Sequence, residues 1–192
     1  MAFYELLTER LRIRLYQVTD AEDRFQMMRA CFPNIKESYE ETVSWVKWTM
    51  DSYKQLERLY QPPYGDYVLE LLDDKTTIGS VGIVPALVAW GSLEAGASEA
   101  EAILLQPEFG LFWGVLPAFQ KQGYASEAAT RLIQYLFENQ QARRVIAHTD
   151  HDNLASQAVM KKAGMRLYHN QVGKPEWFQS LGVIENPAFK KT

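Results

Sequence analysis

The sequence predicts an α/β fold in which helices flank one mixed sheet. Three observations support this prediction: β-rich runs alternate with amphipathic helical runs, a β-meander fills the middle of the chain, and residues 108–149 read as strand, helix and strand. Such a unit normally joins parallel strands through a right-handed crossover, so part of the sheet should be parallel. The 192 residues contain no clear linker, and we expect a single domain over residues 1–192.

The N-terminal half should form one strand, two helices and a hairpin. Thr19–Glu22 and Ser38–Glu41 have the spacing of capping boxes, which mark helix starts. The turn Asp73–Lys75 separates two β-rich runs. The expected elements are a strand at 10–16, a short helix after the first capping box, a helix at 40–60, and strands at 67–72 and 77–88.

The C-terminal half should alternate strands with two helices. The first of these helices has a wide apolar face. The second begins after Asn153, a good N-cap, and ends before Gly164, a good C′ residue, with Ala155, Ala158, Val159 and Lys162 on one side. The expected elements are a loop at 91–107, strands at 108–116, 144–149, 165–169 and 177–184, and helices at 123–139 and 153–164.

Composition and charge argue against several functional classes. A formal charge of -4 and a pI near 5.5 do not suit a protein that follows nucleic-acid phosphates. No stretch is apolar enough to span a bilayer, and no basic segment precedes an apolar run at the start, so we expect a cytoplasmic protein without a membrane partner. Cys31 is the only cysteine, which excludes an intramolecular disulfide. No His/Cys cluster has ligand spacing, so no metal is expected.

The turn before the helix at 123–139 carries the clearest chemical signal. A strand-to-helix turn presents unpaired backbone N–H groups, and the helix dipole adds partial positive charge, so the turn suits a phosphate or pyrophosphate. Gly123 lets the backbone approach an anion, and Lys121 could add a charge-assisted contact. The alternative is that Gly123 merely starts a helix.

The helix after Asn153 carries a second signal, which is weaker alone. Asn153 followed by Ser156 is explained well enough by an N-cap and a first-turn residue.

Together the two signals resemble the GNAT acetyltransferases, in particular their branch of ribosomal-protein-alanine acetyltransferases. The cofactor signature Q/R-x-x-G-x-G/A, a following Glu-Ala pair, an N-x-x-S motif and a closing Gly-Met are all present in order. The matching residues are Gln120, Gly123, Ala125, Glu127, Ala128, Asn153, Ser156, Gly164 and Met165. Leu7–Leu11 and Ile78–Gly82 resemble the branch's first and third strands, so the resemblance covers about residues 7–168.

The resemblance implies a GNAT-like fold with a mostly antiparallel sheet and one splayed parallel strand pair. It also implies transfer of an acetyl group from acetyl-CoA directly to a primary amine, either a protein N-terminus or a small molecule. Homodimers are common in the family, although the sequence leaves the oligomeric state open. The alternative function is a catalytically silent acyl-CoA-binding sensor or interaction module. A longer acyl group, which would need space near Trp113, also stays open.

The resemblance assigns roles to single residues. Backbone groups of Val115 and Leu116 would hold the pantetheine arm. Asn153 would contact a pantetheine amide, and Ser156 would help to protonate the leaving thiolate. The pyrophosphate would bind the backbone N–H groups of Gln120, Lys121, Gln122, Gly123, Tyr124 and Ala125.

Direct transfer also needs a base for the amine, and Glu108 on the preceding strand is the candidate. The alternative for Glu108 is a surface carboxylate at a strand start. His148 and His151 could relay protons, although a solvated loop position suits His151 better. Cys31 lies far from the cofactor motif in sequence, which argues against a covalent acetyl-cysteine route.

The chain departs from the family pattern in three places. Lys121 stands where glycine is common, Met160 stands where many members have a tyrosine acid, and residues 170–192 do not follow the branch. The third departure leaves the acceptor open. Aromatic side chains in the region that covers the acceptor groove should either line a pocket or pack in the core. These residues are Trp45, Trp48, Tyr60, Tyr64 and Tyr67.

Overall fold

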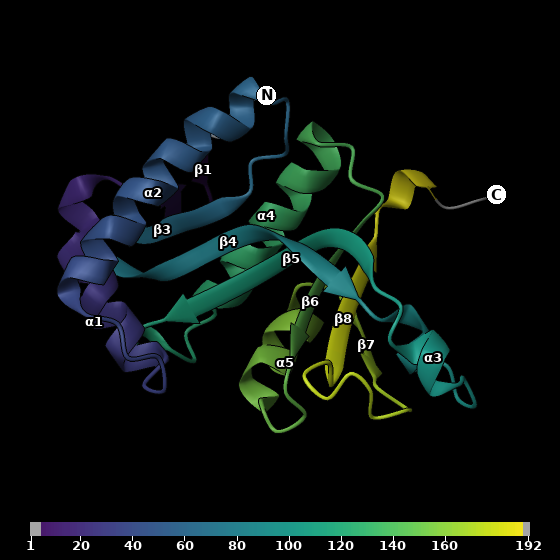
Figure 1. Cartoon of the computed structure of the whole chain (residues 1–192). Helices are drawn as coiled ribbons and strands as arrows, with labels where there is room; N and C mark the ends of the chain where they lie inside the picture. Colours follow the sequence, from purple (N-terminus) through teal and green to yellow (C-terminus); the bar gives the residue numbers. More distant parts are fainter. Residues whose placement is uncertain (1–4, 190–192) are drawn as a thin grey trace. The chain divides into compact units, whose positions relative to one another are not determined.

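A computed structural model describes residues 5–189 and has the mixed α/β architecture predicted from the sequence (Figure 1). The helices are α1 (Ala21–Cys31), α2 (Tyr39–Arg58), α3 (Glu99–Ala102), α4 (Tyr124–Asn139) and α5 (Leu154–Lys162). The strands are β1 (Glu5–Leu7), β2 (Leu11–Arg14), β3 (Gly65–Leu71), β4 (Thr77–Val88), β5 (Gln106–Val115), β6 (Arg144–Thr149), β7 (Arg166–His169) and β8 (Ser180–Glu185). Their order in the sheet is β1-β2-β3-β4-β5-β6-β8-β7.

The chain divides into two compact units. The first contains the residues up to Val84 together with Phe112–Leu132, and the second contains Pro85–Leu111 and the residues from Ile133 onwards. Each of the three points at which the chain passes from one unit to the other lies inside a helix or strand, namely β4, β5 and α4. Whether the whole chain is one domain stays a prediction.

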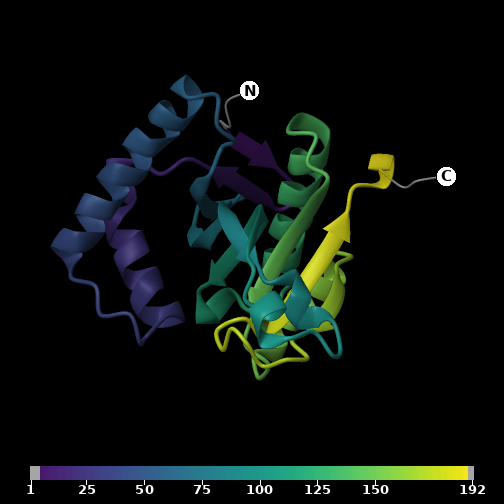
Figure 2. The same cartoon turned by 45° about the vertical axis from the view of Figure 1, so that its right-hand side comes forward.

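In the first unit, β1, β2, β3 and β4 pair antiparallel in sequence order. Helices α1 and α2 lie side by side (Figure 2). Buried Val46 of α2 meets Tyr16, Ala21 and Val68 in an apolar cluster, which anchors the helix pair on the sheet. The apolar spacing predicted from the sequence therefore serves to attach these helices.

The two predicted capping boxes have different outcomes. Ser38 is confirmed: its hydroxyl accepts from the Glu41 N–H at 3.2 Å, and the Glu41 carboxylate accepts from the Ser38 N–H at 2.7 Å. The box at Thr19–Glu22 is wrong, because the N-cap of α1 is Asp20, which makes no side-chain cap bond. The Asp20 carboxylate instead accepts bonds from Arg14 at 2.7 and 2.9 Å and from the Gln17 N–H at 2.7 Å.

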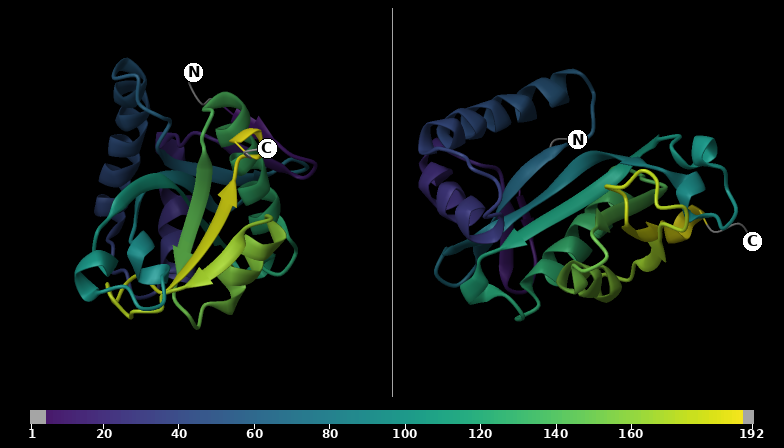
Figure 3. Two further views of the ribbon diagram at one scale, coloured as in Figure 1. Left: turned by 90° about the vertical axis from the view of Figure 1, so that its right-hand side faces the viewer. Right: turned by 60° about the horizontal axis from the view of Figure 1, so that its bottom comes forward.

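In the second unit, β5 pairs parallel with β6, and β8 pairs antiparallel with both β6 and β7. The parallel pairing covers only Phe109↔Val145 and Gly110↔Ile146. Helix α5 lies against β7 and β8, as Figure 3 shows. The core of this unit centres on Ile146 and the fully buried Phe178.

One expectation in the second unit needs correction. The segment 91–107 is not a plain loop, because it contains most of a 3-10 turn at Trp90–Leu93, helix α3 and the start of β5. The buried residues of α5 are Gln157 and Met160. The Gln157 amide donates to the carbonyl of His151 at 2.9 Å, so a polar side chain is buried to fix the preceding loop.

Strands β4 and β5 approach closely where glycines meet in the first unit. A Cβ placed on Gly79 would lie 2.1 Å from the carbonyl oxygen of Gly114, which no side chain can tolerate. Glycine is therefore required at position 79, and it holds this end of β5 directly beside β4. No helix within residues 5–189 is long and apolar enough to cross a membrane.

Candidate functional site: the turn from β5 to α4

The turn between β5 and α4 has an unusual backbone. After a 3-10 turn at Pro117–Phe119, Gln120 is extended, Lys121 takes φ 62° and Gly123 takes φ 90°. Both positive angles lie in the left-handed region, which glycine enters freely and lysine only at a cost of about 1–2 kcal/mol. Glycine's frequency at the Lys121 position in the family therefore has a conformational reason.

This turn exposes a run of backbone donors. Among residues 5–189, the N–H groups from Lys121 to Ser126 donate to no protein acceptor, and the first that does is Glu127, to the Gly123 carbonyl at 3.0 Å. Unpaired N–H groups at the start of a helix of this length, together with its dipole, favour a bound anion. The residues present therefore fit the pyrophosphate that the resemblance implies.

Side chains hold the turn in this shape. The Gln120 amide donates to the Val115 carbonyl at 2.9 Å, and the Gln122 amide donates to the Ala118 carbonyl at 3.2 Å. The Arg10 guanidinium donates to the Gln122 carbonyl at 3.1 Å. These bonds use carbonyl groups and leave the N–H groups from Lys121 to Ser126 available as donors.

Arg10 also ties the turn to α4, a contact that sequence reasoning missed. Its Nε donates to Glu127 at 2.8 Å, its Nη2 lies 2.6 Å from the same carboxylate, and its guanidinium lies 4.4 Å from the centre of the Tyr124 ring. The Thr8 hydroxyl donates to Glu127 as well. The only signal in the sequence was that Thr8 and Arg10 lie in the segment that resembles the family's first strand, and that Glu127 lies in the Glu-Ala pair after the cofactor signature.

These contacts change the ionisation of Glu127. Partial burial alone would raise the pKa of this carboxyl, but the hydrogen bonds from Thr8 and Arg10 outweigh it and hold the pKa below 4.5. Glu127 is therefore ionised at neutral pH and keeps Arg10 in place.

The backbone groups predicted to hold pantetheine are partly used within the protein. The Leu116 N–H donates to the Ile78 carbonyl at 2.9 Å, and the Leu116 carbonyl accepts from Phe119 at 2.8 Å. The Val115 carbonyl accepts from both Gln120 and the Cys31 thiol, the latter at 3.3 Å. Within residues 5–189, three of these four groups, all except the Val115 N–H, thus have a hydrogen-bond partner outside the strand ladder.

Cys31 lies beside the predicted cofactor strand in spite of its distance in sequence. Burial raises the pKa of its thiol. A raised pKa keeps the side chain in the thiol form, which is a poor nucleophile. The argument against a covalent cysteine route therefore rests on protonation and not on distance.

Asn153 and Ser156 occupy the predicted positions in the second unit. Asn153 is the N-cap of α5, and its side-chain oxygen accepts from the Ser156 N–H at 3.0 Å. The Gly164 backbone takes φ 83°, as expected for a residue just past a helix end. The capping interpretation is thus confirmed, while the contacts of Asn153 and Ser156 with pantetheine and thiolate stay predictions.

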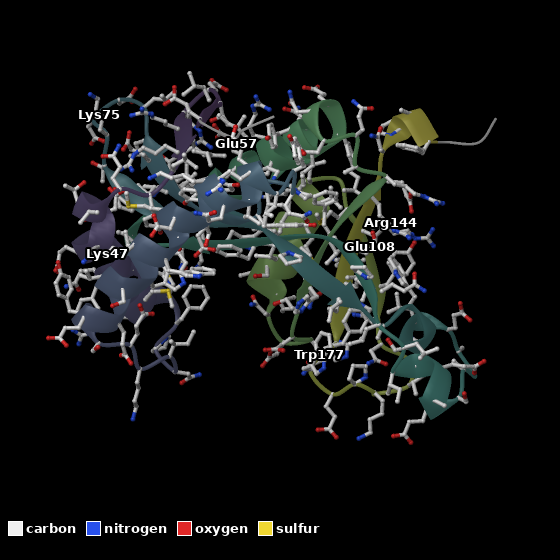
Figure 4. All side chains as sticks on the ribbon, turned by 45° about the horizontal axis from the view of Figure 1, so that its top comes forward. Lys47, Glu57, Lys75, Glu108, Arg144 and Trp177 are labelled. Carbon is white, nitrogen blue, oxygen red and sulfur yellow. The ribbon has the colours of Figure 1, made fainter. Side chains whose placement is uncertain are left out.

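Glu108, the candidate base, is held by an ion pair. Arg144 donates to Glu108 at 2.7 Å, and the Glu108 side chain is only 13% exposed (Figure 4). Arg144 also lies 3.5 Å from Glu185 and packs 4.4 Å from the centre of the Trp90 ring. The Glu108 carboxylate is therefore not a solvent-exposed surface group, and one of its oxygens already accepts a hydrogen bond from Arg144.

The two histidines differ in their surroundings. Desolvation beside Trp177 and Phe178 lowers the pKa of His148 below 6.5, against the opposing effect of Asp150, so His148 is neutral at pH 7. His151 is exposed in the turn after β6, as expected from the sequence, and its Nδ1 also lies 3.0 Å from the buried Ser180 hydroxyl.

The aromatic residues of the first unit are divided between core and surface. Tyr67 is fully buried, whereas Trp48 and Tyr60 are 64% and 96% exposed. Trp45 packs edge-on against Tyr16, with the ring centres 5.5 Å apart. Tyr67 is therefore a core residue, one of the two roles anticipated for this group.

Comparison with known proteins assigns the family. Residues 10–166 match the model of the acetyltransferase (GNAT) domain. The chain belongs to the GNAT acetyltransferase family. The family resemblance and the mostly antiparallel sheet with one parallel pair, both predicted from the sequence, are thereby confirmed.

Two relatives of this GNAT chain come from Bacillus subtilis. It is 27% identical to the uncharacterized protein YkkB, and the match covers 96% of both chains. It is 44% identical to the uncharacterized N-acetyltransferase YnaD over 54 residues, which are 28% of this chain and 32% of YnaD. The chain thus spans about a third of the length of the first curated relatives that it matches.

Solved structures share the GNAT fold at low identity. A ribosomal-protein-S5-alanine acetyltransferase from Vibrio fischeri has a TM-score of 0.67 and 14% identity, with coverage of 98% of this chain and 100% of that one. RimJ from Mycobacterium smegmatis, solved with CoA-disulfide, has a TM-score of 0.63 and 15% identity, with coverage of 95% and 85%. At these identities the likeness supports the fold alone.

Proposed function

We propose that the protein is an N-acetyltransferase that moves an acetyl group from acetyl-CoA directly to a primary amine. The run of unpaired N–H groups from Lys121 to Ser126, at a left-handed Gly123, is the observation that carries this proposal. Membership of the GNAT family agrees with it.

In this proposal the turn binds the donor. The backbone N–H groups from Lys121 through Ala125 surround the pyrophosphate, and the Lys121 side chain adds a charge-assisted contact. The Gln120 N–H, also expected there from the sequence, donates instead to the Pro117 carbonyl at 3.3 Å. The Val115 N–H binds the pantetheine arm, because the Leu116 N–H donates to Ile78 of β4 and the Leu116 carbonyl accepts from Phe119. Asn153 contacts a pantetheine amide through its side-chain nitrogen, because its oxygen caps α5.

Direct transfer then needs orientation of the two reactants and proton transfer from the amine. Ser156 is the proposed acid for the departing thiolate. Glu108 is the candidate base predicted from the sequence, although the ion pair with Arg144 makes its carboxylate a weaker proton acceptor. An N–H group at the strand end polarises the thioester carbonyl without a special side chain.

An acetyl-transfer assay tests the proposal. The purified protein is incubated with acetyl-CoA and a panel of primary amines, and both thiol release and the acetylated amine are measured. Amine-dependent thiol release, reduced in Ser156→Ala, is expected. A protein that binds acetyl-CoA but transfers nothing to any amine would instead be the silent acyl-CoA-binding module.

A further inference from the structure

A cavity of about 290 Å³ lies within the first unit. Its wall includes apolar side chains of α1 and of the strands, among them Met27 and Phe112. It also includes three charged or polar residues, namely Arg24, Asp66 and Ser80. Gly114 also lines the cavity and directly precedes Val115, whose N–H is the proposed pantetheine contact. The cavity therefore opens beside the strand end at which the acetyl group is expected.

Arg24 is buried beside the Tyr16 hydroxyl and two carboxylates, and one of its donors is left without a partner. Its side chain is 5% exposed, and its Nε has no hydrogen-bond partner. The nearest carboxylates, Asp66 and Glu37, lie 3.8 and 3.9 Å away, which is beyond hydrogen-bond distance. A buried guanidinium N–H without an acceptor lowers the stability of the folded protein. A ligand oxygen that accepts a hydrogen bond from it would remove this penalty, which favours binding of the ligand.

Trp45 fixes the direction in which Arg24 can act. The guanidinium carbon lies 3.3 Å from the centre of the Trp45 ring, so one face of the cation is covered by the indole. The N–H groups at the edge of the guanidinium remain oriented for a ligand in its plane, which favours a carboxylate. Trp45 therefore contributes to the cavity through Arg24, without lining it.

Asp66 supplies the opposite charge and a means of taking up a proton. Burial raises the pKa of Asp66 to about 7, although Arg24 opposes the shift. The other groups around it are Glu37, Tyr16 and Tyr53, and burial raises the pKa of both tyrosines, so neither ionises near neutral pH. A carboxylate that titrates near neutral pH suits a general base.

We propose that this cavity binds the acceptor as an apolar α-amino acid, whose carboxylate pairs with Arg24 and whose amine gives a proton to Asp66. The proposal rests on the proposed acetyltransferase function and names its substrate class. In an α-amino acid the amine and the carboxylate are attached to the same carbon and so lie close together. The protein groups proposed to bind them, the Arg24 guanidinium and the Asp66 carboxylate, are also close, at 3.8 Å. The apolar wall then accepts the side chain, and the small volume suits a small molecule.

The step balances without a further reactant. Asp66 removes one proton from the ammonium group, and the freed nitrogen lone pair bonds to the thioester carbonyl carbon. The C–S bond breaks, and the thiolate leaves with its electron pair and takes a proton from the Ser156 hydroxyl, which is replaced by the second proton lost by the nitrogen. The products are the N-acetyl amino acid and free CoA, and Asp66 returns its proton to solvent.

Acceptor kinetics test the proposal directly. Leucine, leucinamide, a short peptide with N-terminal leucine and a diamine are compared as acceptors by kcat/KM. Leucine is expected to exceed leucinamide by roughly 10-fold or more, because only the free carboxylate pairs with Arg24. Equal transfer to the amide or the peptide would overturn the proposal and would indicate a polypeptide acceptor.

Two variants separate the roles of the charged groups. Arg24→Gln should raise KM for leucine and remove the preference over leucinamide, whereas Arg29→Gln, an exposed arginine on the same helix, should change neither. Asp66→Asn should lower kcat and abolish the rise in kcat near pH 7. An unchanged preference in Arg24→Gln, or an unchanged pH profile in Asp66→Asn, would contradict the proposal.

Two readouts need no turnover. Leucine should raise the melting temperature of the wild-type protein and not of Arg24→Gln. Because the pKa of Asp66 is raised in the folded state, the stability that protonated Asp66 contributes is lost as pH rises through about 7. Asp66→Asn cannot ionise at this position. Its melting temperature relative to that of wild type should therefore be higher at about pH 8 than at about pH 5. Both variants should bind acetyl-CoA with the affinity of the wild type. If the wild-type protein itself did not bind acetyl-CoA, the proposed function would be refuted, and not only the acceptor class.

Discussion

Lys121 combines a conformational cost with a proposed role in donor binding. Its φ of 62° places it in the left-handed region, and its N–H is the first of the run of unpaired N–H groups. Contact of its ammonium group with a phosphate would offset the cost of this backbone conformation.

Lys121→Gly should therefore stabilise the protein by up to about 1 kcal/mol, since relief of backbone strain exceeds the added entropy of the unfolded chain. The same variant should weaken acetyl-CoA binding through loss of the charge. Urea unfolding and donor titration measure the two effects. Lys75→Gly is the matched control, because Lys75 has φ 61° in the β3–β4 turn (Figure 4) and should gain stability with unchanged donor affinity. Lower stability in Lys121→Gly would contradict the strain argument.

At the scale of elements, the Arg10–Glu127 contact joins the segment between β1 and β2 to the first turn of α4. The bonds of Thr8 and Arg10 to Glu127 fix the start of the helix, and the Arg10 bond to Gln122 fixes the turn before it. We infer that this contact keeps the N–H groups of the turn in position for an anion.

Glu127→Gln should lower the free energy of unfolding by roughly 1 kcal/mol at neutral pH, because Arg10 is partly exposed and solvent screens the pair. The pKa of Glu127 is lowered in the folded state, so its stabilisation is complete above the normal value of 4.5 and is lost as pH falls through the lower folded value. The difference between variant and wild type should shrink at about pH 3. Urea unfolding at both pH values measures it, with Glu138→Gln on the same helix as the control. A pH-independent difference would refute the ion pair as its cause.

Local patterns in the sequence predicted most elements, and long-range contacts explain the failures. The caps at Ser38 and Asn153 were predictable because each side chain bonds to the backbone three residues away. Thr19 failed as a cap because Asp20 is engaged by Arg14 on a strand. The partnership of Arg10 with Glu127 joins residues 117 positions apart, and the surroundings of Arg24 include Trp45 of α2 and Asp66 of β3, so neither leaves a local pattern.

At the scale of the molecule, the two units share β4, β5 and α4 as continuous elements. Domain boundaries normally fall in exposed linkers, and no such linker separates these units. We therefore predict one cooperative unfolding transition, with equal calorimetric and van't Hoff enthalpies. Differential scanning calorimetry measures this, and two separable transitions would contradict the single domain over residues 1–192.

The most direct test of the account is a calorimetric titration with acetyl-CoA of wild type, Gly123→Trp and Gly173→Trp. Gly173 has φ 78° and open space around its Cβ position, so it controls for placing tryptophan at a left-handed glycine. Melting curves establish that each variant is folded. The account predicts binding by wild type and Gly173→Trp, and at least about 10-fold weaker binding by Gly123→Trp, because the indole would fill the space before the N–H groups. Absence of binding by folded wild type, or equal binding by Gly123→Trp, would contradict the assignment of this turn as the acetyl-CoA site.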